Sequence, residues 1–170
     1  MTINEEDRRR LGFWVADCAE RVLPLFEAKA PSDPRPCEAI EGIRVFARGG
    51  KRTAKLRALV WAAYAAAREV GDPVATAAAR AAGLAAGSAY IHTRVTLDQA
   101  KHALGPAMYA ARARELAAGD DPRAGDKEIR WAIKHAAPAV REIVRRMPVR
   151  SPGRSRQDAL FYQLDAGLRR

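Results

Sequence analysis

The sequence predicts an all-α protein, a compact domain of about six to seven helices with no sheet. Alanine is unusually abundant in the 170 residues and β-branched residues are sparse, which favours helix over strand. Apolar residues recur at steps of three and four, as on one face of a helix. No run alternates apolar and polar residues for more than a few positions. Helices of similar length in the middle of the chain are compatible with stacked helical pairs.

The first predicted helix has one apolar face and is followed by a proline-rich turn. Pro24 lies inside the pattern and should kink or end the helix, because a proline removes a backbone hydrogen bond. The turn spans Pro31 to Pro36, and Gly49 and Gly50 end the second helix. The apolar face of the first helix consists of Leu11, Trp14, Val15, Cys18, Val22, Leu25 and Phe26.

Polar caps delimit the next three helices. The third helix starts near Thr53, and Asp72 with Pro73 opens the fourth as N-cap and first helical residue. Thr96 and Gln99 fit a capping box at the start of the fifth. The apolar row of the third helix is Leu56, Leu59, Val60, Ala63, Ala67 and Val70.

The fourth helix has small residues at every fourth position. Ala75, Ala79, Gly83 and Gly87 leave one face nearly bare, so a neighbouring backbone can approach closely. Glycine costs up to about 1 kcal/mol against alanine in a helix interior, and close packing is the expected compensation. We therefore expect this helix to be central, although the same face could also support a homodimer.

The C-terminal part is predicted as a fifth and a sixth helix, a basic connection and a terminal helix. Gly105-Pro106 should kink the fifth helix, and Gly125-Asp126 should cap the sixth, which Pro138 bends in its middle. Residues 148–170 form the basic connection and a last helix capped at Ser155. Residues 1–170 are expected to form a single domain.

Composition excludes several functional classes. Cys18 and Cys37 make neither a disulfide framework nor a Cys-x-x-Cys pair. The acidic N-terminus does not resemble a signal peptide, and no apolar stretch is long enough for a membrane span, so we expect a cytoplasmic protein without membrane contact. There is no phosphate-binding glycine loop, nucleophile motif or metal-ligand spacing. No metal, cofactor or enzymatic activity is expected.

The strongest surface signal is positive charge. The formal net charge is +10, and residues 134–156 contain seven basic residues against one acid, Glu142. Such an excess favours an acidic partner or phosphate groups. A solvated, solubilising surface is an equally good interpretation. The candidate partner-binding residues are Arg141, Arg145, Arg146, Arg150 and Arg154.

Several ionisable residues lie at helical spacing and suggest either ion pairs or a cleft. We expect a structural network that joins the first two helices through Asp17, Glu20, Arg35, Glu41 and Arg44. His102 and Tyr109 fall on one face of the fifth helix. An acid–base site would require Asp17, Glu20 and His102 to converge in a cleft, and this is the least favoured interpretation.

The N-terminal stretch carries a family resemblance. Residues 14–23 read Trp-Val-Ala-Asp-Cys-Ala-Glu-Arg-Val-Leu, and Phe26-Glu27, Pro31, Asp33, Arg35-Pro36 and Ala39-Ile40-Glu41 follow. Together with the Ala-rich middle and the stretch from His102 to Ala110, this pattern resembles a family of small bacterial immunity proteins from polymorphic toxin systems. The resemblance covers about residues 11–115, and Cys37 departs from it where a basic residue is common.

The resemblance implies an all-helical protein that binds and neutralises a cognate toxin. Occlusion of the toxin would need no catalytic residue in this chain, and a net charge of +10 predicts an acidic contact surface on the partner. The alternative is a nucleic-acid-binding helical protein that uses the basic surface of residues 134–156. That alternative predicts an affinity that falls steeply with salt.

Overall fold

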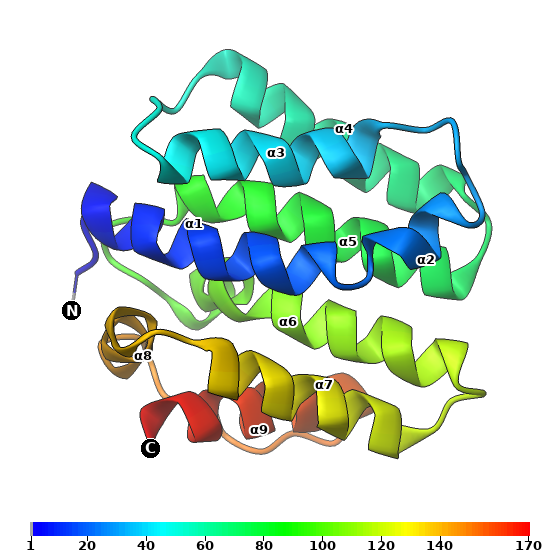
Figure 1. Cartoon of the computed structure of the whole chain (residues 1–170). Helices are drawn as coiled ribbons and strands as arrows, with labels where there is room; N and C mark the ends of the chain where they lie inside the picture. Colours follow the sequence, from blue (N-terminus) through cyan, green and yellow to red (C-terminus); the bar gives the residue numbers. More distant parts are fainter. Residues whose placement is uncertain (1) are drawn as a thin grey trace.

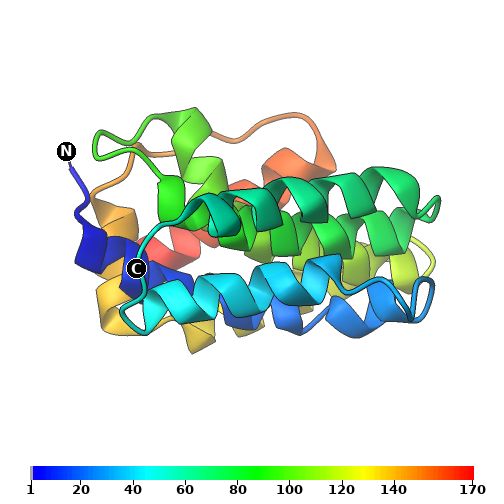
Figure 2. The same cartoon turned by 90° about the horizontal axis from the view of Figure 1, so that it is seen from above.

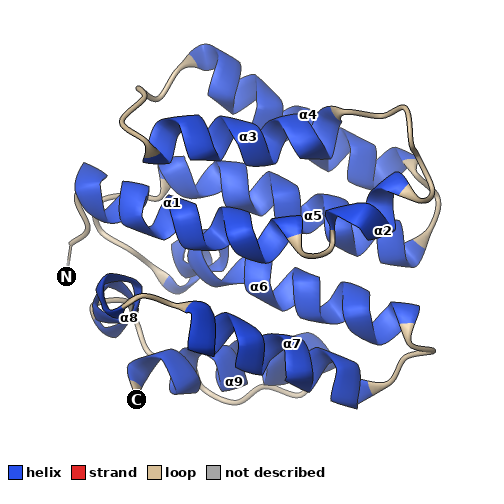
Figure 3. Cartoon of the chain, viewed as in Figure 1, coloured by secondary structure: helices blue, strands red, loops and turns tan. Residues whose placement is uncertain are grey.

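The computed structural model describes residues 2–170, which form nine α-helices and one short 3-10 helix (Figures 1 and 3). These residues contain no strand, and Thr2 and Arg94 form an isolated antiparallel bridge. The all-α prediction is confirmed. The elements are α1 (Glu5–Glu20), α2 (Leu23–Glu27), α3 (Arg35–Ala47), α4 (Ala54–Glu69), α5 (Pro73–Gly87), η1 (Ser88–Tyr90), α6 (Leu97–Ala117), α7 (Pro122–His135), α8 (Pro138–Arg145) and α9 (Arg156–Arg169).

Two prolines explain why residues 2–170 contain nine α-helices where the sequence predicted six to seven. Pro24 was expected to kink or end the first helix and Pro138 to bend the sixth, and each lies in the first turn of a new helix, α2 and α8. A proline has no N–H and clashes with the carbonyl four residues before it, whereas the first helical turn needs no such donor. The chain therefore leaves the helix before each proline and restarts there. At Pro106, by contrast, α6 continues.

Four of the predicted N-caps are present in the structure. The side-chain oxygens of Thr53, Asp72, Thr96 and Ser155 each accept a hydrogen bond from the backbone N–H three residues later. Asp158 completes a capping box with Ser155. These bonds satisfy backbone donors that a helix start leaves unpaired, and they fix where α4, α5, α6 and α9 begin.

Two other cap predictions are wrong. The amide oxygen of Gln99 does not return to Thr96 but accepts from the backbone N–H of His92 at 3.2 Å. Gly125 lies inside α7, which begins at Pro122 after the N-cap Asp121. Another donor, the His92 N–H, was available to Gln99, and an earlier proline, Pro122, was available to start α7, neither of which periodicity alone reveals.

The central helix is α5, as predicted. Ten of its 15 residues are buried, and it contacts α1, α2, α3, α4, α6 and η1. Its small side chains allow this many neighbours to approach. Gly83 lies against Tyr64 of α4, and Gly87 lies against His102 of α6. The bare face is therefore used within the chain and is not available for a homodimer.

The helices are arranged in rows. Figure 1 shows α3 and α4 on one side of α1 and α5, with α6, α7 and α9 on the other side. Seen from above, α3 and α4 lie in front of the remaining helices (Figure 2). Because α4 packs mainly on α3 and α5, its remaining side faces solvent.

The rows enclose one continuous set of buried apolar side chains that extends from Ile3 to Leu168. It includes residues of the N-terminal segment and of α9, so both ends of the described chain are fixed by packing. Within residues 2–170 no helix combines the length and the apolar character needed to cross a bilayer.

The close contact between α5 and α4 can be tested with Gly83→Ala. We expect this substitution to lower the free energy of unfolding by about 1–3 kcal/mol, because overpacked cores strain. A Cβ atom there would lie 2.7 Å from two ring carbons of Tyr64. Urea unfolding measures the effect. Tyr64→Ala should lower the free energy of unfolding less in the Gly83→Ala background than in the wild-type background. Strictly additive losses of stability would contradict the steric explanation.

Candidate functional site

The C-terminal arginines are mostly engaged within the chain. Arg141 donates hydrogen bonds to the carbonyls of Ile133 at 2.7 Å and Gly167 at 3.2 Å. Arg145 donates to the backbone oxygens of Arg169 and Arg170, at 3.2 and 3.3 Å. These contacts join α8 to α7 and α9. The two side chains therefore hold helices together rather than presenting unoccupied donors.

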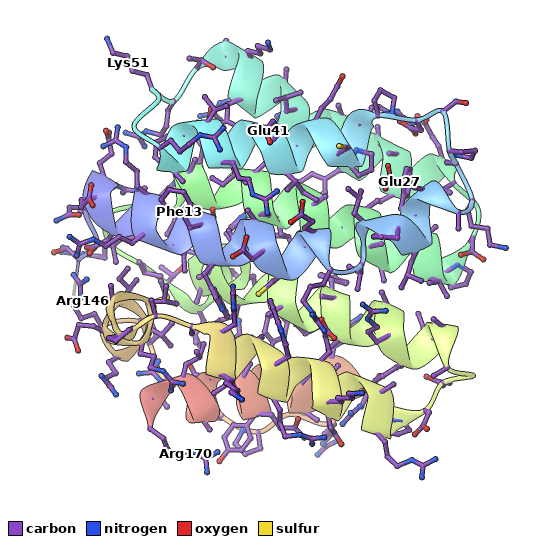
Figure 4. The ribbon with its side chains drawn as sticks, viewed as in Figure 1. Phe13, Glu27, Glu41, Lys51, Arg146 and Arg170 are labelled. Atoms are coloured by element: carbon purple, nitrogen blue, oxygen red, sulfur yellow. The ribbon has the colours of Figure 1, made fainter. Side chains whose placement is uncertain are left out.

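The other three arginines differ in their surroundings. Arg150 lies over the ring of Phe161, with its guanidinium carbon 4.2 Å from the ring centroid. Arg146, which is labelled in Figure 4, pairs with Asp7 at 2.7 and 3.0 Å. Arg154 is exposed and makes no hydrogen bond or ion pair with any residue of the described part of the chain. Of the five candidate partner-binding arginines, only Arg154 is thus without a partner among the described residues.

The pair between Asp7 and Arg146 holds the N-terminal helix against α8. Burial alone would raise the pKa of Asp7. The hydrogen bond from Arg146 and that from the Asn4 backbone N–H, with the charges of Arg146 and Arg10, outweigh burial. The net result is a pKa below the usual 3.8. The Asp7 carboxylate is therefore ionised and paired at neutral pH.

The five residues expected to form one ion network make three separate contacts. Arg44 of α3 binds both Asp17 and Glu20 of α1, at 3.0 and 2.7 Å. Arg35 binds Asp33 and Glu69, and Glu41 binds Arg48. The structure therefore joins α1 to α3 through Arg44, without Arg35 or Glu41.

The residues considered for an acid–base site do not converge. Asp17 contacts His135 at 2.8 Å and Arg44, on the α1 side of the molecule. His102 lies in a hollow beside α4, whereas Tyr109 lines a different hollow beside α9. Among residues 2–170 no cluster of three or more His, Cys, Asp or Glu side chains could hold a metal ion.

The most unusual exposed side chain is Trp61 on α4. It is 63% exposed, whereas Trp14 is 3% exposed and donates its indole N–H to the carbonyl of Ala132. Trp61 packs edge to face on Tyr64, with ring centroids 6.0 Å apart. Tryptophan is enriched among the residues that contribute most to protein–protein binding, and it is seldom left on a surface without such a role.

Two hollows flank α4. On one side, Leu56 and Leu59 of α4 face Val45 and Gly42 of α3 in an open groove of about 440 Å³. Val45 is 51% exposed, and Glu38 and Glu41 also border this groove. On the other side, Trp61 lines a second hollow of about 420 Å³. The helix α4 is therefore a ridge that carries an exposed tryptophan between two depressions.

Positive charge surrounds the N-terminal end of this ridge. Lys51, Lys55 and Arg57 have no carboxylate within 4 Å anywhere in the described residues, and Arg52 reaches Glu5 only at 4.0 Å. Figure 4 shows Lys51 extending from the loop between α3 and α4. Unlike most of the C-terminal arginines, these cations keep their donors open. The outer face of α4 thus combines an aromatic anchor, apolar depressions and unneutralised charge.

Sequence patterning had not selected this face. One signal was nevertheless present: Trp61 falls outside the buried row of Leu56, Val60 and Ala63. A large aromatic residue out of phase with the apolar face of its own helix should be exposed. By contrast, no pattern could reveal that Arg146 meets Asp7, because the two lie 139 positions apart.

The comparisons with known proteins give the family. The model for a family described as "Imm-5 like putative immunity protein" matches residues 1–139, and the chain belongs to that family. The match extends beyond the resemblance noted over residues 11–115 and includes α7 and the whole α4 face. No curated protein and no solved structure matches the chain.

The Asp7–Arg146 pair gives a test of whether Arg146 is structural. At pH 7, Asp7→Asn should lower the free energy of unfolding by about 1.5–3 kcal/mol, as expected for hydrogen bonds to a charged group. Because folding lowers the pKa of Asp7, its contribution is complete above the unfolded pKa of about 4 and is lost as the pH falls further.

Chemical denaturation of wild type and Asp7→Asn between neutral and acidic pH measures this difference. The exposed pair of Glu142 and Arg145 provides the control, and Glu142→Gln should change stability by less than about 0.5 kcal/mol. An Asp7→Asn protein as stable as wild type at neutral pH would show that Arg146 is free for another role.

Proposed function

We propose that this protein binds a toxin and neutralises it by occlusion, with the outer face of α4 as its main contact surface. The family to which the chain belongs supports a toxin partner. Occlusion requires only a stable complex over the toxin's own site and no catalytic group from the inhibitor. We further propose that the described chain acts as one domain, consistent with its single continuous core.

The observation that carries the proposal is the setting of Trp61. This side chain is 63% exposed between two depressions, which are also lined by the unneutralised cations at the N-terminal end of α4. An aromatic anchor with flanking pockets is typical of the centre of a protein interface, and charge around it selects and steers the partner. We therefore propose that the toxin surface is acidic, with apolar side chains that enter the depressions.

The C-terminal arginines have a secondary place in this proposal. Arg141, Arg145, Arg146 and Arg150 bind other parts of the chain, but the side chain of Arg145 remains exposed, like that of Arg154. Charge at some distance from an interface still raises the rate of association at low salt. Arg145 and Arg154 are therefore expected to attract an acidic partner without contributing strongly to the complex.

Nucleic acid is the alternative partner of the surface formed by residues 134–156. Phosphate binding needs arginine and lysine donors that are open to the backbone of the nucleic acid. Four of the five arginines proposed for this role already donate to protein groups or lie over an aromatic ring. This arrangement favours a protein partner over nucleic acid.

The role of α4 is tested by Trp61→Ala. Wild type and variant are first used as baits in nuclease-treated native lysate, and the captured protein is then purified. We expect the variant to bind it more weakly by about 2 kcal/mol or more, roughly thirtyfold in Kd. Expression of the captured protein alone should arrest growth, and wild type should relieve the arrest better than Trp61→Ala.

Phe13→Ala is the matched control for this test. Phe13 is also an exposed aromatic residue, at 46%, but it lies on α1 (Figure 4). The variant should bind and protect like wild type. Equal binding by Trp61→Ala and wild type would remove α4 from the interface. Capture of nucleic acid released by salt, with no protein that survives nuclease treatment, would contradict toxin binding itself.

The charge contribution is tested separately. The double variant Lys55→Gln/Arg57→Gln should associate more slowly with the captured toxin at low salt, by about tenfold, and the difference should shrink as salt screens the charges. Stopped-flow or surface-based kinetics measure this rate. Arg145→Gln/Arg154→Gln removes the same charge elsewhere and should have the smaller effect. If Arg145→Gln/Arg154→Gln slowed association more than Lys55→Gln/Arg57→Gln, the contact surface would instead lie on residues 134–156.

A further inference from the structure

The hollow on the α6 side of α4 has the composition of an anion site. It has a volume of about 420 Å³, within the range of small-ligand pockets. Its walls come from α4, from the segment after α5 and from α6. Two arginines and two histidines line it, and none of its lining residues is a carboxylate. In a chain with 20 acidic residues, a lining with two guanidinium groups and no carboxylate needs an explanation, and Glu5, outside the lining, reaches Arg52 only at 4.0 Å.

The arginine on α4 is held in place with its donors open. The guanidinium carbon of Arg57 lies 4.4 Å from the centroid of the Tyr90 ring. That ring is itself fixed, because the Tyr90 hydroxyl donates to the carbonyl of Thr53 at 2.8 Å. A guanidinium stacked on a ring keeps its edge N–H groups for a carboxylate or a phosphate in the same plane. Arg52 lines the same hollow.

His102 supplies a third donor. Its Nδ1 atom is buried without a hydrogen-bond partner among the described residues, against Gly87, where a Cβ atom would lie only 2.9 Å away. Burial, with the charges of His92 and Lys101, lowers the pKa of His102, so the ring is neutral at pH 7. With no acceptor beside the buried Nδ1, the proton belongs on Nε2, and the His102 side chain lines the hollow.

The remaining wall is aromatic. Trp61 stands at the mouth of the hollow, packed on Tyr64. Burial raises the pKa of Tyr64 to about 12, so its hydroxyl stays a neutral hydrogen-bonding group. An exposed indole beside guanidinium groups offers a flat surface for a ring that is attached to an anion. Lysines or arginines alone would attract anions of any shape.

We propose that this hollow binds a small anion attached to a flat ring, with the anionic group between Arg52, Arg57 and Nε2 of His102 and the ring on Trp61. The inference goes beyond the proposed toxin binding, because the site is complete in the isolated chain. Carboxylate and phosphate share the recognition chemistry, which is a planar or tetrahedral oxyanion next to guanidinium groups.

NMR titration of the isolated protein tests the site with four probes: AMP, indole-3-carboxylate, adenosine and inorganic phosphate. We expect at least one ring-bearing anion to bind with a Kd at or below about 1 mM. It should shift the Trp61 indole N–H and the His102 ring signals. The Trp14 indole N–H, bonded to Ala132, serves as the internal reference and should not move. Adenosine and inorganic phosphate should bind at least about tenfold more weakly than that anion, since each lacks half of the recognised group.

Variants locate the binding. Arg57→Gln and Trp61→Leu should each raise the Kd of the ring-bearing anion by about tenfold, because each removes a charged or stacking contact. Arg68→Gln, which removes an exposed cation from the last turn of the same helix, should have no effect. Preference for AMP would identify a phosphate ligand, and preference for indole-3-carboxylate a carboxylate ligand.

Three results would overturn the inference: no shift with either ring-bearing anion, equal binding of inorganic phosphate, or binding that survives Arg57→Gln. None of them bears on the toxin, because these titrations contain no partner protein. Conversely, a toxin that binds Trp61→Ala as tightly as wild type would contradict the proposed toxin interface but not the anion site.

Discussion

Close packing against α5 decides where the other helices of this protein can lie. The faces of α5 carry mainly alanine and glycine, so that five other α-helices contact α5 directly. At Gly83 and Gly87 the space that a side chain would need is taken by Tyr64 and His102. A central helix of small residues gains stability only through such neighbours, because its own side chains bury little apolar area.

The same constraint places the proposed functional face. With α5 covered on one side by α4, the outer side of α4 has nothing further to pack against. Tyr64 and His102 reach toward α5 and leave a hollow beside them, and Trp61 stands at its mouth. Polar pairs elsewhere, such as Arg146 with Asp7, fix the outer helices to this centre. The inner side of the α4 ridge is packed on α3 and α5, which reduces the conformational entropy lost on binding.

Periodicity and capping predicted the helical class, the central helix and most helix starts, because these depend on residues a few positions apart. Thr53, Asp72 and Ser155 cap the helices expected of them. The proline positions were recognised, but whether Pro24 or Pro138 bends or ends a helix depends on the surrounding packing. The C-terminal arginines were chosen as a charge cluster, and contacts such as Arg141 with Gly167 leave no trace in sequence spacing. The exposure of Trp61 could have been predicted, because this residue falls outside the apolar face of its own helix.

The central claim is that the partner covers α4. Hydrogen exchange of the complex, compared with the isolated protein, tests it most directly, because a bound partner slows exchange of the amides that it covers. We predict the main protection within α4 and in the segment from Lys51 to Thr53, with little change from Pro138 to Arg156. Protection concentrated over Pro138 to Arg156, with α4 unchanged, would contradict the account.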